Sequence, residues 1–159
     1  PIGAHPSGLI GEEPVGKPNN IFPIILQVAA NNSQIFNIYG DDWDTHDGTG
    51  VRDYIHIVDL SNGHVRALEF LLENQPQYLS LNLGTGIGTS VLELIKSFEI
   101  ANKIKIPYNI TKRRKGDVGF TVADNSLAKK TLNWEPKKDI KQMCIDGWKW
   151  QKYLIKISA

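Results

Sequence analysis

The feature that most constrains the fold is a glycine-rich turn that leads directly into a capped amphipathic helix. Three alternate glycines occupy positions 84–88, and Ser90 with Glu93 forms the Ser-x-x-Glu pattern of a capping box. Apolar residues then recur every three or four positions over 91–98, which is the spacing of one buried helix face. We therefore predict a helix from residue 91 and a strand at 78–83, just before the turn.

The remaining segments predict a mixed α/β fold of helices and short strands, in a single domain that spans residues 1–159. No period is visible in residues 1–19, which are expected to form a loop. Apolar side chains are expected to line the inner face of the second helix, at Val65, Leu68, Leu71 and Leu72. The other predicted helices cover 21–29 (capped by Asn20), 60–73 (capped by Asp59), 124–133 (capped by Asp124) and the segment from Asp139. The other predicted strands cover 35–39, 51–57, 107–112 and 120–123.

Composition excludes several classes of protein. Basic and acidic residues nearly balance, at 18 and 17, and no basic stripe of the kind that binds nucleic acid is present. No apolar run approaches the length of a membrane span, so no membrane contact is expected. Cys144 is the only cysteine, which fits a reducing compartment, and we expect a cytoplasmic protein.

Three local patterns resemble catalytic or ligand-binding motifs but fail on spacing. The glycines at 84–88 are two apart throughout, whereas a dinucleotide fingerprint needs Gly-x-Gly-x-x-Gly. Tyr108 and Lys112 match Tyr-x-x-x-Lys, yet they fall in a predicted strand, where four residues span about 13 Å. The acidic loop that starts at Asp42 has Asp47 and Asp53 where a calcium loop needs glycine and glutamate, and His46 is expected at the surface. No catalytic residue and no metal site are therefore predicted.

Two segments instead predict a site for an anionic nucleotide. Gly48–Asp59 interleaves strand-forming residues with Arg52 and Tyr54, and a purely structural strand rarely carries so many functional groups. In the second segment, 113–117, two arginines precede an aspartate, which suits a diphosphate beside a ribose hydroxyl. Tyr39 and Tyr54 offer aromatic faces for a base.

Taken together, the motifs resemble the C-terminal half of the UDP-glucose 4-epimerases, which are extended short-chain dehydrogenases/reductases. The resemblance runs the length of the chain and is carried by Pro1–Gly8, Pro18–Asn20, Tyr39–His56, Asn82–Gly86, Arg113–Asp117 and Trp148–Gln151. It implies the C-terminal, UDP-sugar-binding portion of such an enzyme, with the Rossmann core mostly missing. In that family an N-terminal Rossmann half holds NAD and carries the catalytic tyrosine, lysine and serine, so no cofactor is expected on this chain.

The resemblance also assigns roles to individual residues. Asn20 and Ile21 match family positions near the diphosphate, and Asn37 and Ile38 match those that flank uracil. Tyr39 stands where an aromatic ring stacks on the base. The two diphosphate arginines correspond to Arg52 and Arg114, and the ribose-binding carboxylate to Asp117. At Thr121 the family has a gate near the sugar, where a small residue admits N-acetylhexosamines; the complete enzyme is therefore expected to accept UDP-N-acetylglucosamine.

The chain opens at Pro1 without a methionine, so we expect either a processed product or a piece of a longer protein. The resemblance implies an NAD-binding half upstream of Pro1, without which this chain is expected to be inactive. The expected partners are UDP-glucose or UDP-galactose, that N-terminal half, and in its absence a further copy of the chain. Two alternatives stay open: half of a nucleotide-sugar dehydratase or decarboxylase, and a non-catalytic UDP-binding module.

Overall fold

Helix α3 (Val91–Asn102) forms as the capping box predicts and lies at the centre of the main core. The backbone N–H of Ser90 donates to Glu93 Oε2 over 2.8 Å, and the backbone N–H of Glu93 donates to Ser90 Oγ over 3.0 Å. Two backbone N–H groups at the start of the helix, which have no acceptor within it, are thereby satisfied. Leu94 and Phe98 point inward and are fully buried, so the predicted apolar face is confirmed.

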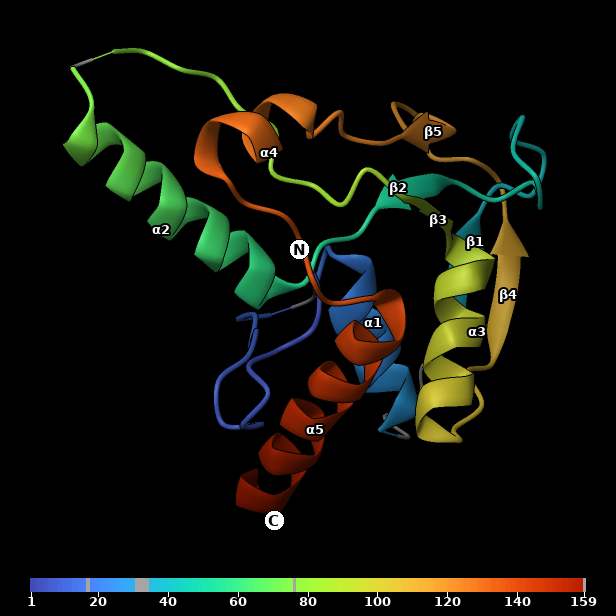
Figure 1. Cartoon of the computed structure of the whole chain (residues 1–159). Coiled ribbons are helices and arrows are strands. Elements are labelled where there is room, and N and C mark those ends of the chain that lie inside the picture. Colours follow the sequence, from blue (N-terminus) through green and yellow to red (C-terminus); the bar gives the residue numbers. More distant parts are fainter. Residues whose placement is uncertain (17, 31–34, 76, 159) are drawn as a thin grey trace.

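The structure, a computed structural model, describes residues 1–16, 18–30, 35–75 and 77–158, and these form five helices and five short strands (Figure 1). Besides α3, the helices are α1 (Ile21–Ala29), α2 (Ile57–Glu73), α4 (Ser126–Leu132) and α5 (Ile140–Ser158). The strands are β1 (Phe36–Tyr39), β2 (Val51–Asp53), β3 (Gly88–Ser90), β4 (Tyr108–Thr111) and β5 (Phe120–Thr121). The predicted mixed α/β class with short strands is confirmed.

Two small sheets bring distant segments together. In one, β1 pairs in parallel with β4, with Tyr39 opposite Thr111. In the other, β2 lies between β3 and β5, antiparallel to β3 and parallel to β5. Both sheets end near the same corner of the molecule (Figure 1). The loops that follow β1 and β4 and the middle of β2 are therefore neighbours in space.

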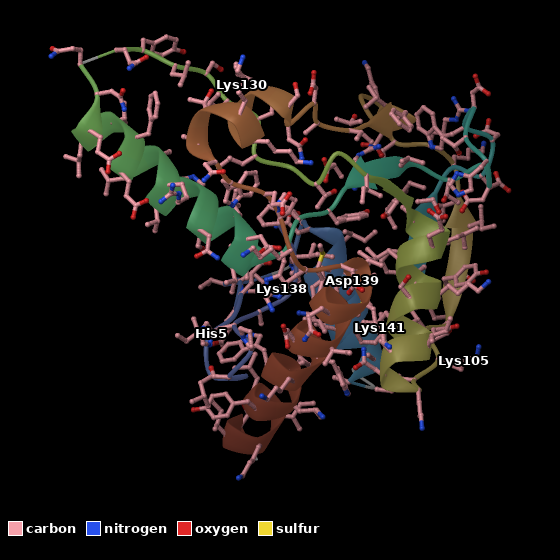
Figure 2. All side chains as sticks on the ribbon, viewed as in Figure 1. His5, Lys105, Lys130, Lys138, Asp139 and Lys141 are labelled. Carbon is pink, nitrogen blue, oxygen red and sulfur yellow. The ribbon has the colours of Figure 1, made fainter. Side chains whose placement is uncertain are left out.

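Most of the buried apolar side chains form one core between α1, α3, α5 and β1. Phe22 meets Phe98 edge to face with ring centroids 6.3 Å apart, and Phe98 meets Trp148 in the same way at 6.0 Å. A second, smaller core joins α2 to α4 around Leu132 and Trp134. Figure 2 shows basic side chains such as Lys105 and Lys130 on the periphery, where they stay hydrated.

The start of α2 corrects two predictions. Strand β2 ends at Asp53 rather than at residue 57, and the helix cap is His56, not Asp59. The Nδ1 atom of His56 accepts from the backbone N–H of Val58, so the proton sits on Nε2, which donates to Asp146 Oδ2 over 3.2 Å. Burial lowers the pKa of His56 and favours this neutral tautomer. The histidine thus joins α2 to α5 inside the protein.

Asp59 has a different role from the one predicted. Its Oδ2 accepts from the backbone N–H groups of Lys137 and Lys138, over 2.9 and 2.8 Å. The carboxylate therefore ties the first turn of α2 to the segment that leads into α5.

The predicted strand at 78–83 does not form, and the predicted inner face of α2 faces solvent. The segment has no ladder partner among the described residues, and Tyr78 is 95% exposed. Val65, Leu68 and Leu72 are 54%, 58% and 78% exposed. Sequence periodicity identified the apolar stripe correctly but not what lies against it.

The other element boundaries differ by a few residues. The predicted strand 120–123 is paired only at Phe120–Thr121, and the short strand β3 was missed. Asn125 rather than Asp124 occupies the cap position of α4. Asn20 caps α1 in position but makes no side-chain cap bond. Asp139 does cap α5, because its Oδ1 accepts from the backbone N–H of Gln142 over 2.7 Å. Within the described ranges, no helix combines the length and apolarity needed to cross a bilayer.

Candidate functional site

A cavity of about 320 Å³ lies where α1, β1, β2 and the loop after β4 meet. Eight of the nine residues that the sequence singled out for ligand binding line it. They are Asn20, Ile21, Asn37, Ile38, Tyr39, Arg52, Arg114 and Asp117. These residues come from four separate stretches of the chain, and the fold alone brings them together.

Thr121 is the one predicted site residue outside the cavity lining. It is exposed on β5, where it pairs with Arg52 of the neighbouring strand. Directly paired residues on neighbouring strands extend from the same face of the sheet. Thr121 therefore extends from the same face as Arg52 and lies beside the cavity, outside its lining.

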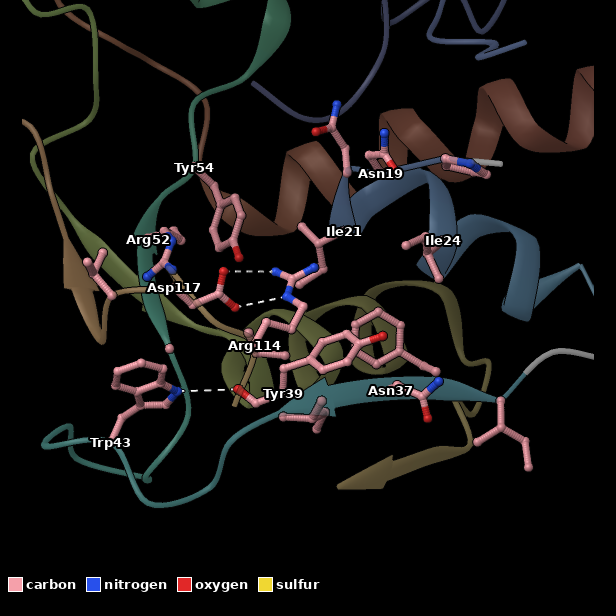
Figure 3. Close-up of a pocket in the computed structure, with 18 of the residues that line it drawn as sticks. Asn19, Ile21, Ile24, Asn37, Tyr39, Trp43, Arg52, Tyr54, Arg114 and Asp117 are labelled. Atoms are coloured by element: carbon pink, nitrogen blue, oxygen red, sulfur yellow. Dashed lines mark hydrogen bonds and ion pairs between the residues drawn. The ribbon is translucent and has the colours of Figure 1, made fainter. Parts of the chain in front are cut away.

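The two arginines that line the cavity differ in the hydrogen bonds that their guanidinium groups already make. Arg114 lies over the ring of Tyr39, 4.5 Å from the centroid, and its Nε donates to Asp117 Oδ2 over 2.9 Å (Figure 3). Arg52 donates one bond from a terminal nitrogen to the carbonyl oxygen of Val51 over 2.8 Å. Because a guanidinium has five N–H donors, Arg52 keeps donors for a ligand.

Aromatic and amide side chains complete the lining. Tyr54 points into the cavity beside Arg52 and Asp117 (Figure 3). Burial raises the pKa of its phenol to about 12, and the positive charge of Arg52 only partly opposes that shift. Tyr54 is therefore neutral near pH 7 and offers a hydrogen bond rather than a base. With two guanidinium groups and two tyrosines, the cavity suits a ligand that is anionic at one point and aromatic at another.

Several residues of the cavity were missed by sequence reasoning. Trp43 lines it from the loop after β1, and Ile24 and Gln27 line it from α1. The two residues of α1 lie one turn apart, and one and two turns beyond Asn20, so helical spacing from Asn20 was the signal that could have found them. For Trp43 no comparable signal exists, because it lies in an irregular loop.

The glycine turn at 84–88 does not fit a dinucleotide, because an internal carboxylate takes its donors. Asp53 Oδ1 accepts from the backbone N–H of Thr85 over 2.9 Å, and Oδ2 accepts from that of Gly86 over 2.9 Å. A Cβ atom on Gly84 would lie 2.5 Å from the same Oδ2, so the turn closes tightly around Asp53. The residues of this turn thus provide no place for the diphosphate of NAD.

The polar residues that define the other two local patterns do not line the cavity. Tyr108 falls in β4 as predicted, and neither it nor Lys112 lines the cavity. In the acidic loop, Asp47 Oδ1 accepts from the backbone N–H of Thr49 over 2.9 Å, and its other oxygen accepts from Ser90 Oγ. His46 is exposed and lies 3.1 Å from Glu93 Oε1. Asp47 therefore ties this loop to the cap of α3.

The sequence matches a family model over residues 4–146, and the model describes GDP-mannose 4,6 dehydratase. It is also similar to curated UDP-glucose 4-epimerases. It is 50% identical to the Bacillus subtilis enzyme over 151 residues, which are 95% of this chain and 44% of that protein. With the human enzyme the identity is 50% over 152 residues, or 96% of this chain and 43% of the relative. The chain therefore spans less than half the length of these relatives.

Solved structures of UDP-glucose 4-epimerases have the same fold. The Stenotrophomonas maltophila enzyme, with bound NAD and formylated UDP-arabinopyranose, superimposes with a TM-score of 0.94 at 49% identity. That match covers 98% of this chain and 46% of the other. The Bifidobacterium longum enzyme, in complex with NAD+ and UDP, gives 0.91 at 46% identity and covers 96% and 45%.

Proposed function

This chain belongs to the GDP-mannose 4,6 dehydratase family of extended short-chain dehydrogenases/reductases, and from that premise we propose that it is the substrate-binding half of a UDP-glucose 4-epimerase. One observation carries the proposal. Residues assigned to diphosphate, ribose and base come from four stretches of sequence and line a single cavity. The epimerase relatives, about 50% identical over nearly all of this chain, support UDP-glucose and UDP-galactose as the substrates.

Each part of the nucleotide has a proposed partner in the cavity. Arg52 and Arg114 hold the diphosphate, since forked guanidinium donors match phosphate oxygens, and Asn20 and Ile21 border it. Tyr39 stacks on uracil, which Asn37 and Ile38 flank. Asp117 accepts from a ribose hydroxyl, and for this Arg114 must first give up part of its present bond to that carboxylate.

The redox chemistry belongs, in this proposal, to a second, NAD-binding half. NAD bound there would supply reversible hydride transfer at the sugar C4. In this chain the backbone donors of the glycine turn already bond to Asp53, so we assign NAD binding to the other half. What this chain contributes is the binding and orientation of the UDP group.

The exposed stripe of α2 supports a docking surface for that second half. Leu68 and Leu72 project from one helix face into solvent, and the neighbouring segment 78–83 pairs with no strand in the part of the chain that the structure describes. Exposed apolar stripes and unpaired extended segments mark contact surfaces. We place the N-terminal Rossmann half here in the complete enzyme, and a further copy of the chain here when that half is absent.

Two wider assignments complete the proposal. Residues 1–159 form one domain, because Asp59 and His56 bond the α2 region to α5 and its leading segment. The protein works in the cytoplasm, where its buried, unpaired Cys144 stays reduced.

The direct test titrates UDP, GDP and NAD separately into the purified chain. We expect UDP to bind, GDP to bind more weakly because its purine is larger, and NAD not to bind. Binding of NAD would contradict the assignment of the cofactor to the other half. GDP binding that exceeds UDP binding would favour a GDP-sugar dehydratase instead.

Thr121 gives a prediction about the range of sugars. In the complete enzyme, replacing Thr121 with tyrosine is expected to lower kcat/KM for UDP-N-acetylglucosamine at least tenfold, on the order of a steric discrimination in a shaped site, with UDP-glucose little changed. The added ring would fill the space beside Arg52 that the acetyl group needs.

The matched control is Thr89→Tyr, which adds the same ring on the opposite side of Arg52, where Thr89 is the paired residue of β3. An equal loss in both variants would show that the ring disturbs Arg52 rather than gating the sugar. A wild-type enzyme with no turnover of the acetylated sugar would also contradict the prediction.

A further inference from the structure

Arg113 and Arg114 are adjacent, but their side chains have separate surroundings. Arg114 lines the cavity, whereas Arg113 does not. The Nε atom of Arg113 lies 2.6 Å from Asp42 Oδ1, and the same guanidinium donates to the carbonyl oxygen of Asp42. Arg113 thus joins the segment after β4 to the loop after β1 by two bonds to one residue.

The same guanidinium also rests on an aromatic ring that borders the cavity. Its central carbon lies 3.9 Å from the ring centroid of Trp43, which is within the range of a cation–π contact. Trp43 donates from Nε1 to the carbonyl oxygen of Tyr39 over 3.3 Å (Figure 3). A chain of contacts therefore runs from Arg113 through Trp43 to the backbone of the stacking residue Tyr39.

Glycines on both sides leave room for this cluster. A Cβ on Gly40 would lie 2.7 Å from Arg113 Cγ and 2.7 Å from Trp43 Nε1. On the other side, a Cβ on Gly119 would lie 2.9 Å from Trp43 Cε3. The backbone at Gly40 and Gly119 therefore packs directly against these side chains. An ion pair that merely lies on the surface would not need such close packing.

We propose that Asp42, Trp43 and Arg113, here named the Arg113 clasp, position Tyr39 and Arg114 for the nucleotide. Arg113 in this view is a positioning residue that touches no part of the ligand. The inference rests on the proposed function, because it concerns how the UDP group is held. Its physical basis is that the end of β1 supplies Tyr39 and the loop after β4 supplies Arg114. The clasp fixes the segments that follow these two strands against each other, beyond the last paired residues, Tyr39 and Thr111.

The competing explanation is an exposed ion pair without functional effect. Arg113 and Asp42 are 40% and 69% exposed, and ion pairs at such positions often contribute little to stability. The two explanations differ in what they predict for binding. A surface pair affects neither KM nor kcat, whereas a positioning residue affects the affinity for the UDP group alone.

The test uses Arg113→Met in the complete enzyme, with steady-state turnover of UDP-glucose and calorimetric titration of UDP. We expect KM and the Kd of UDP to rise about tenfold, the order of one charge-assisted hydrogen bond, while kcat changes less than twofold. Arg113→Lys keeps the charge near Asp42 but loses the flat guanidinium, and it should give an intermediate rise. Lys115→Met removes one positive charge from the same exposed segment and should leave both constants within twofold.

Three results would overturn the clasp. The first is an unchanged KM in Arg113→Met. The second is a rise in KM in Lys115→Met as large as that in Arg113→Met. The third is a fall in kcat in Arg113→Met as large as its rise in KM. If Arg113→Met does not fold, Asp42→Asn decides, since it weakens the same contact from the exposed side. A wild-type enzyme that neither binds UDP nor converts UDP-glucose overturns the proposed function itself, whereas wild-type turnover with an unaffected Arg113→Met overturns only the clasp.

Discussion

Replacing Asp53 with alanine is expected to lower the free energy of unfolding of this chain by about 3 kcal/mol, because several half-buried donors lose their acceptor together. Oδ1 accepts from the backbone N–H and the hydroxyl of Thr85. Oδ2 accepts from the backbone N–H groups of Gly86 and Ala123, over 2.9 and 3.3 Å. Water can restore part of these bonds in the variant, since Asp53 is not fully buried, and the expected loss allows for that.

The two oxygens of Asp53 allow a graded experiment. Asp53→Asn keeps one oxygen, which can still serve Thr85, and turns an NH2 group toward the donors of Gly86 and Ala123. We therefore expect about half the destabilisation of Asp53→Ala, because only the bonds from Gly86 and Ala123 are lost. Denaturant titration followed by circular dichroism measures both values.

Asp44→Ala is the control, since Asp44 is an exposed aspartate in the loop after β1. It should change the free energy of unfolding by less than about 0.5 kcal/mol. If Asp53→Ala behaved like Asp44→Ala, the glycine turn would hold its shape without the carboxylate. The turn would then be available to an external anion.

Local signals allowed good predictions wherever one segment determines its own structure. The Ser90–Glu93 capping box and the Asp139 cap both form, because the bonded groups lie within one helical turn of each other. The cap of α2 was wrongly predicted at Asp59. Its carboxylate bonds to Lys137 and Lys138, far along the chain, and no local rule describes that competition.

Segments whose partners lie elsewhere could not be predicted from periodicity. Residues 78–83 have the composition of a strand, yet a strand needs a neighbouring strand to bond with, and the described residues provide none. The stripe at Val65 and Leu68 has correct helical spacing but is exposed. Both cases follow from the same cause: a pattern reveals that a face is apolar and leaves its contact undetermined.

The residues of the candidate site could be predicted mainly from the family resemblance. The structure adds that two arginines adjacent in the sequence have different surroundings. Sequence reasoning grouped Arg113 with Arg114, because both belong to one basic run. The fold separates them: Arg114 lies over Tyr39 and lines the cavity, whereas Arg113 lies over Trp43 and is not itself part of the lining. Such a division depends on the direction of each side chain, which a basic run in sequence does not specify.

Replacing Arg52 with alanine in the complete enzyme is expected to weaken UDP-sugar binding by about 2 kcal/mol, or about 30-fold, as for a charge-assisted hydrogen bond to phosphate. Arg52 is expected to contribute more to diphosphate binding than Arg114, because among the described residues its guanidinium donates only to the carbonyl oxygen of Val51. Arg114 must exchange its bonds with Asp117 for bonds to the diphosphate, which reduces its net gain.

This difference between the arginines makes the prediction specific. Calorimetric titration of UDP should show a larger loss of affinity for Arg52→Ala than for Arg114→Ala combined with Asp117→Asn, because the double variant also removes a carboxylate that would repel the diphosphate. Lys96→Ala, on the exposed side of α3, controls for the loss of one positive charge at a distance. Unchanged affinity in Arg52→Ala would leave Arg52 as an ordinary residue of the central strand β2, and the diphosphate would then depend on Arg114 alone.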